Sequence, residues 1–304
     1  MNNVTIHPAK EVGRFLLAAA AMAAAEFVVG AALAPFNPME GAVDAVFWRL
    51  FFGSAVIVGN AFVYFIRSSR YHGLKLFGLS FLAYVGVAQL LGHVETIAFN
   101  FLFEFTPAQI AYLVVSQLLT ALVFVPLAML VAGKWKESAP LVDAADAATT
   151  VGDAADGATD GTATFPALPV KSLLIRLAIL GVLWYLCYMF AGYFIADPIT
   201  HDYYAAKMDN LERINAWLPV LQFFRGLAWT GLVVLGIRIM NRPLRESGLI
   251  VGLLYGVFHA AGLLLPSEFM PAEMRLSHLP EIVLSLAMFA PLAVSVLTYR
   301  KKRA

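Results

Sequence analysis

The chain has 304 residues, of which 61% are hydrophobic and 13% charged, and its formal net charge is +1. Soluble proteins carry about 25% charged residues, and the mean hydropathy here is +0.76, so the composition predicts an integral membrane protein. The balanced charge offers no basic surface for nucleic acid. The single cysteine, Cys187, excludes an intramolecular disulfide.

Eight apolar runs are long enough to cross a bilayer. A hydrocarbon core of about 30 Å requires about 20 helical residues. The runs therefore predict an all-α fold, a polytopic bundle of eight transmembrane helices that contacts the lipid bilayer. We place them near residues 14–34, 45–66, 74–93, 107–132, 174–196, 218–240, 247–265 and 280–299.

The first run resembles a secretory signal in its flanks, because Lys10 and Arg14 precede it and the triplet 32–34, Ala-Leu-Ala, follows. It is longer than the usual apolar core of about 7 to 15 residues in such signals. It also contains Glu26. We therefore expect a retained first helix.

The segment 92–107, "GHVETIAFNFLFEFTP", follows the third run and is still apolar. A helix that continued through it would exceed the bilayer thickness, so we expect a break there. Such a break would let His93 and Glu95 converge, although residues two apart do not share a helix face. The fourth helix is expected to begin at Pro107, because Thr106 is a suitable N-cap and Gln109 completes a capping box.

Residues 134–172 join the fourth and fifth runs, and the stretch 137–169 contains six acidic residues but no lysine or arginine. Such a composition cannot bury enough apolar surface to fold, so it predicts a disordered acidic cytoplasmic linker. The linker separates a first four-helix half, residues 1–133, from a second, residues 173–304. The two halves align weakly, with Arg14 on Arg176, which predicts two parallel four-helix repeats. Similar composition alone is the alternative explanation.

Two polar stretches in the second half have local interpretations. Residues 200–217 show apolar positions at helical spacing between charged ones, which predicts a short amphipathic helix on the outer surface. In "MRLSHLPEIVLS", residues 274–285, Pro280 suits the first position of the last helix. Glu281 would then lie in the first turn, where the helix dipole favours an anion. His278 would lie just before the helix and would not be restricted to one of its faces.

Positive charge is distributed unequally between the two sides of the predicted bundle. Sixteen of the 21 Lys and Arg residues fall on the side of both termini. The positive-inside rule therefore predicts cytoplasmic termini. A composition rich in Ala, Gly and Asp suits a bacterial inner membrane. The remaining five basic residues lie on the outer side: Arg49, Lys207, Arg213, Arg225 and Arg275.

Most histidines and several carboxylates also fall on the outer side, which predicts an outward-facing polar site. His93, His278 and His259 are candidate zinc ligands, with Glu95 and Glu281 as candidate catalytic carboxylates. Imidazole and carboxylate suit zinc, and a zinc-bound water could hydrolyse a membrane-embedded substrate. A lone intramembrane histidine such as His259 more often makes a hydrogen bond between helices.

Two other functions remain open. Arg49, Arg225 and Arg275 are candidate substrate-binding residues for an anion, which would suit a transporter or a lipid-handling protein. Arginines near the end of a membrane helix also reach the lipid headgroups without any binding role. The third alternative is a membrane scaffold or assembly factor that uses the acidic linker as a tether. Two intramembrane peptidase signatures, a Glu-Glu pair and Gly-x-Ser-x-Gly, are absent.

Overall fold

The fold is a bundle of membrane-spanning helices. The computed structural model describes residues 8–38, 44–100, 104–136, 165–206, 216–267 and 270–299. Within these ranges eight helical spans are long and apolar enough to cross a membrane, and there is no strand. The predicted all-α, multi-pass membrane fold is therefore confirmed. The spans are Pro8–Phe36, Ala45–Arg67, Gly73–Ala98, Pro107–Ala132, Val170–Ala205, Leu218–Ile239, Leu244–Leu264 and Ala272–Thr298.

Four spans consist of a single α-helix: α2 (Ala45–Arg67), α6 (Pro107–Ala132), α10 (Leu218–Ile239) and α12 (Ala272–Thr298). A fifth span consists of α1 (Pro8–Leu33) and a short terminal turn. The other three change helical type along their length. A π-helical turn, Gly86–Leu90, joins α3 (Gly73–Val85) to α4 (Leu91–Ala98), and a second, Gly192–Ala196, joins α7 (Val170–Ala191) to α8 (Asp197–Ala205). A 3-10 turn, Ala261–Leu264, extends α11 (Leu244–Ala260).

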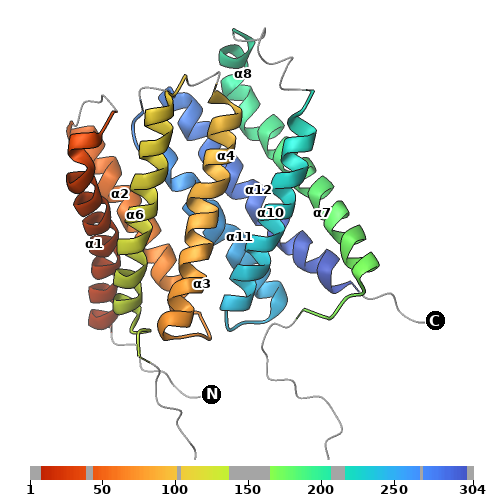
Figure 1. The fold of residues 1–304 in the computed structure, drawn as a ribbon, viewed down its shortest axis with the longest axis horizontal. Coiled ribbons are helices and arrows are strands. Elements are labelled where there is room, and N and C mark those ends of the chain that lie inside the picture. Colours follow the sequence, from red (N-terminus) through yellow and green to blue (C-terminus); the bar gives the residue numbers. More distant parts are fainter. Residues whose placement is uncertain are drawn as a thin grey trace, which may run out of the picture.

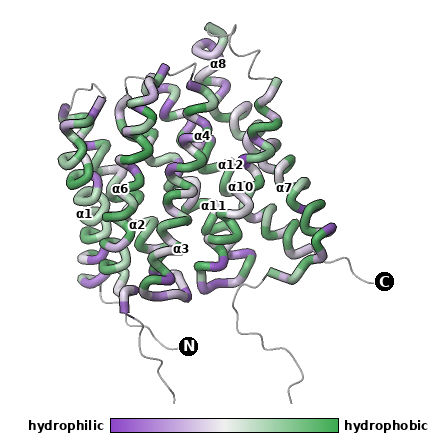
Figure 2. The backbone as a smooth tube through the Cα atoms, in the orientation of Figure 1, coloured by the Kyte–Doolittle hydropathy of each residue, from purple (hydrophilic) through white to green (hydrophobic). Residues whose placement is uncertain are grey.

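The helices of each half pack in the same order. α1 contacts α2 and α6 in the first half, and α7 contacts α10 and α12 in the second. α1 begins and α12 ends at the same end of the bundle (Figure 1). Hydrophilic residues border the loops at that end (Figure 2). This matching order is what a parallel repeat requires, and the repeat itself stays a prediction.

The start of α6 follows the predicted capping pattern. The Thr106 hydroxyl accepts a hydrogen bond from the Gln109 backbone N–H, and the Gln109 side chain accepts one from the Thr106 N–H. Both otherwise unpaired donors are thereby satisfied. The helix ends at Gly133, whose φ of 71° lies in the left-handed region that glycine adopts without strain.

The contacts that join the halves include a cluster of aromatic rings and a set of hydrogen bonds between two loops. Phe62 and Phe65 of α2 pack against Phe258 of α11, with ring centroids 5.5 and 6.4 Å away. All three rings are buried. At the end where α1 begins, Ser69 forms an isolated antiparallel bridge with Met240, and Arg70 donates hydrogen bonds to the Met240 carbonyl. We call this second set the loop clasp.

Parts of two predicted segments lie outside the described residues. The middle of the linker, residues 137–164, is one of them. Its first residues are ordered, because Lys134 donates to the Ser69 carbonyl and Trp135 donates to the Pro126 carbonyl. Residues 207–215, half of the predicted surface helix, are the other, and α8 contains the first residues of that predicted helix.

Candidate functional site

A pocket of about 200 Å³ lies between α4, α7, α8, α10, α11 and α12. Two of these elements, α4 and α8, lie toward the end of the bundle opposite the start of α1 (Figure 1). Its lining combines aromatic and ionisable side chains, among them Glu95, Tyr188, Arg225, His278 and Glu281. These residues come from spans of both halves, so the pocket depends on how the halves pack.

The last helix positions two of these residues differently from the sequence prediction. α12 begins at Ala272, and Pro280 lies inside it. The prediction that Pro280 is the first helical residue is therefore wrong. A proline removes only one backbone donor, a loss that a membrane helix tolerates within a bundle. Because His278 and Glu281 are three apart on a continuous helix, they share one face.

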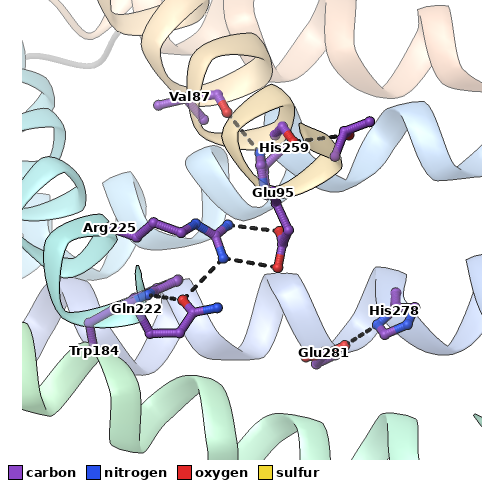
Figure 3. Close-up of polar contacts among 10 residues, drawn as sticks. Val87, Glu95, Trp184, Gln222, Arg225, His259, His278 and Glu281 are labelled. Carbon is purple, nitrogen blue, oxygen red and sulfur yellow. Dashed lines mark hydrogen bonds and ion pairs between the residues drawn. The ribbon is translucent and has the colours of Figure 1, made fainter. Parts of the chain in front are cut away.

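His278 and Glu281 form a hydrogen-bonded pair at the pocket. Nδ1 of His278 contacts Oε2 of Glu281, as Figure 3 shows. The other ring nitrogen, Nε2, lies 3.0 Å from the hydroxyl of Tyr204 on α8. The side chains of His278 and Glu281 are 20% and 5% exposed. Glu281 therefore fixes the imidazole so that Nε2 faces Tyr204.

Arg225 on α10 is held by a carboxylate from the other half of the chain. Its two terminal nitrogens donate to the two oxygens of Glu95 over 2.9 and 2.8 Å. Gln222 adds an acceptor 3.1 Å away, and the same oxygen accepts from Trp184 (Figure 3). Only 4% of the Arg225 side chain is exposed, against 27% for Glu95. The guanidinium is thus neutralised and largely hidden behind Glu95.

The chain does leave the helix within the segment 92–107, as expected, but it does so beyond Glu95, so the predicted convergence of His93 and Glu95 is wrong. Helix α4 runs without interruption from Leu91 to Ala98, and the chain leaves the helix only after Ala98. Residues two apart therefore point to different sides. Glu95 lines the pocket, whereas His93 does not. Nε2 of His93 is buried and has no hydrogen-bond partner among the described residues.

His259 reaches the pocket from α11. Its Nδ1 lies 2.8 Å from the carbonyl of Val87, which belongs to the first π-helical turn. A carbonyl only accepts, so Nδ1 carries the proton and Nε2 keeps its lone pair. The ring lies edge-on to Trp229, with centroids 5.2 Å apart. This hydrogen bond between helices matches the structural alternative described for a lone intramembrane histidine.

The described residues contain no group of three or more His, Cys, Asp or Glu side chains arranged to hold a metal ion. The three predicted ligands instead have separate surroundings. His259 contacts the Val87 carbonyl, His278 contacts Glu281 and Tyr204, and His93 lies outside the pocket. The geometry therefore gives zinc no support, and the function proposed below does not use it.

The other two arginines predicted to bind substrate lie apart from Arg225. Arg275 is buried, and its guanidinium donates to the carbonyls of Leu263, Leu265 and Met270. These contacts satisfy the end of the 3-10 turn after α11, which is a structural role. Arg49 is exposed near the start of α2 and is not part of the pocket lining.

Among the site residues that sequence reasoning missed are three aromatic residues, Trp184, Tyr188 and Tyr204, and the polar residue Gln222. Gln222 had a usable signal, because it lies three residues before Arg225 on the same helix. The three aromatic residues had none, since aromatic side chains are common throughout the apolar runs.

No protein-family model matches the chain, and neither a curated protein nor a solved structure matches it. The functional conclusion rests on the geometry of the pocket.

Proposed function

We propose that this protein is a membrane enzyme in which His278 acts as a general base on a substrate that enters the pocket from the bilayer. The supporting observation is the hydrogen bond between His278 Nδ1 and the buried Glu281 carboxylate. A histidine oriented in this way presents its second nitrogen for proton transfer. In this structure the second nitrogen contacts the hydroxyl of Tyr204 on α8.

Hydrolysis is the simplest reaction for this arrangement. With Nδ1 donating to Glu281, Nε2 carries the lone pair, which faces the Tyr204 hydroxyl in this structure. When that hydroxyl turns to the substrate, Nε2 accepts the proton of a water molecule. The water oxygen bonds to the substrate carbonyl carbon, the bond between that carbon and the leaving group breaks, and His278 gives the proton to the leaving group. The Tyr204 hydroxyl, next to Nε2, can donate to the oxygen that becomes negative. Glu95 keeps Arg225 in place and thereby shapes the adjacent wall.

The proposed setting is a bacterial inner membrane, with cytoplasmic termini and an outward-facing pocket. Support comes from the distribution of positive charge over the described residues. Most lysines and arginines lie at the end of the bundle where α1 begins, whereas Arg49, Arg225 and Arg275 lie toward the pocket end. This bias follows the positive-inside rule.

The test is product formation in proteoliposomes. Purified protein is reconstituted with a total lipid extract of its host, and the lipids are compared by mass spectrometry before and after incubation. We expect a new product with the unmodified protein and a loss of about 100-fold or more for His278→Gln, because general-base catalysis contributes about 10² to 10⁴. His201→Gln is the matched control, since His201 is exposed on α8 outside the pocket.

The same experiment separates the alternatives. Product formation that His278→Gln leaves unchanged would rule out the proposed role of His278. Flux of a lipid or solute across the vesicle membrane without any product would favour a transporter. Absence of both, together with a stable protein partner recovered in mild detergent, would favour a scaffold.

A further inference from the structure

We infer that the group bound in this pocket is a small organic ammonium, an inference that rests on the proposed function and names its substrate class. Three observations point to a cation. They are a carboxylate oxygen at the pocket that accepts no hydrogen bond from the described residues, an arginine that is already neutralised, and a wall of aromatic rings.

The unpaired oxygen belongs to Glu281. Its Oε2 contacts His278, but its Oε1 accepts no hydrogen bond from any residue that the structure describes. The side chain is only 5% exposed and lines the pocket. A carboxylate oxygen that faces a largely apolar pocket without a protein donor is a ready acceptor for an N–H donor of a ligand.

The charge of the lining favours the same ligand. Glu95 and Glu281 contribute two negative charges, and Arg225 contributes one positive charge. With His278 neutral, as a general base must be, one negative charge remains uncompensated. Arg225 cannot attract an anion effectively, because Glu95 binds it through both oxygens and covers it. An anionic ligand would therefore meet carboxylates first, whereas an ammonium would balance the charge.

Aromatic rings complete the wall around these carboxylates. Phe99, Trp184, Tyr188 and Tyr204 line the pocket from α7, α8 and the end of the third span. Aromatic faces attract organic cations, and combinations of rings and carboxylates recognise alkylated ammonium groups. The volume of about 200 Å³ is below the roughly 300 to 1,000 Å³ of pockets for drug-sized ligands. It therefore suits a headgroup, whose remaining chain would lie in the bilayer.

Two sources share this chemistry, an amine-bearing membrane lipid and a free alkylamine. The test uses purified protein in a neutral detergent, with calorimetric titration of butylammonium and butanesulfonate. These probes have the same alkyl chain and opposite charges. We expect butylammonium to bind at least about tenfold more tightly. Competition by short-chain phosphatidylethanolamine, but not by short-chain phosphatidylglycerol, would identify the lipid as the source, and competition by neither would identify the free amine.

Variants assign the binding to the pocket. Glu281→Gln should weaken butylammonium binding at least about tenfold, because it removes the uncompensated charge. Glu273→Gln, an exposed site in the first turn of α12, should leave it unchanged. Equal or tighter binding of butanesulfonate, or full butylammonium binding by a folded Glu281→Gln protein, would overturn the inference.

Butylammonium binding should not depend on catalysis. His278→Gln keeps the two carboxylates and should keep butylammonium binding within about threefold, even though it abolishes the proposed reaction. If His278→Gln loses turnover but the unmodified protein does not bind ammonium, only the inferred substrate class is overturned. Ammonium binding combined with unchanged turnover in His278→Gln would overturn the proposed function alone.

Discussion

A charged residue inside a membrane span predicts that a partner of opposite charge or a wet cavity lies nearby. Arg225 shows that the sequence does not identify that partner. Burial of an unpaired guanidinium is costly, so the sequence requires a carboxylate or a wet cavity nearby. The structure pairs Arg225 with Glu95. The choice depends on which helices pack side by side, and apolar runs of similar composition do not specify that.

The Arg225–Glu95 pair should be strongly coupled. Glu95→Ala leaves a guanidinium that is 4% exposed without its counter-charge. We expect a stability loss of about 3 to 5 kcal/mol, as for other broken buried ion pairs. Arg225→Met combined with Glu95→Ala should recover part of it, because no buried charge remains. Denaturant unfolding of the single and double variants in mixed micelles measures the coupling.

Arg49→Met provides the matched control for this cycle. Arg49 is exposed near the start of α2, so its replacement should change stability by less than about 0.5 kcal/mol. Additive effects of the Glu95 and Arg225 replacements would show that the two side chains do not interact.

Helix ends and helix contacts differ in how well the sequence predicts them. The capping residues Thr106 and Gln109 locate the start of α6, because they satisfy backbone groups locally. The sequence did not predict the start of α12 correctly. Proline occurs both at the first position of a helix and inside a membrane helix, so Pro280 alone does not distinguish the two. Pro271 followed by Glu273 also fits a helix start, and that signal places His278 and Glu281 on one face.

Close contacts between helices depend on particular glycines. A methyl group at Gly59 of α2 would lie 2.3 Å from the Ala18 carbonyl oxygen of α1. Gly59→Ala should therefore push these helices apart and cost about 1 to 3 kcal/mol. Thermal unfolding followed by circular dichroism measures the loss.

Gly53→Ala is the control within the same helix, because nothing lies within 4 Å of a methyl group there. It should be neutral or stabilise the protein by up to about 1 kcal/mol, since alanine is the better helix former. A Gly59→Ala protein as stable as the Gly53→Ala protein would contradict the packing of α1 on α2.

At the scale of the whole molecule, the sequence predicts the number and direction of the spans but not the pocket. Length and hydropathy determine how many helices cross the bilayer. The pocket needs Glu95 from the first half beside Arg225, His278 and Glu281 from the second. No local pattern encodes such long-range contacts. The site therefore exists only while the two halves stay together.

The contacts between the halves should hold them together after the connection is cut. A protease site inserted between residues 136 and 165 would be cleaved only from the cytoplasmic side, if the proposed orientation is right. We expect a tagged first half to retain the second in mild detergent, because Phe62 and Phe65 pack on Phe258 and the loop clasp joins the halves at the end where α1 begins. Phe258→Ala should reduce the retained fraction, since loss of a buried ring costs about 3 to 5 kcal/mol. Phe224→Ala, on an exposed face of α10, should not. Separation of the unmodified halves on cleavage would show that the linker, rather than their interface, keeps the pocket assembled.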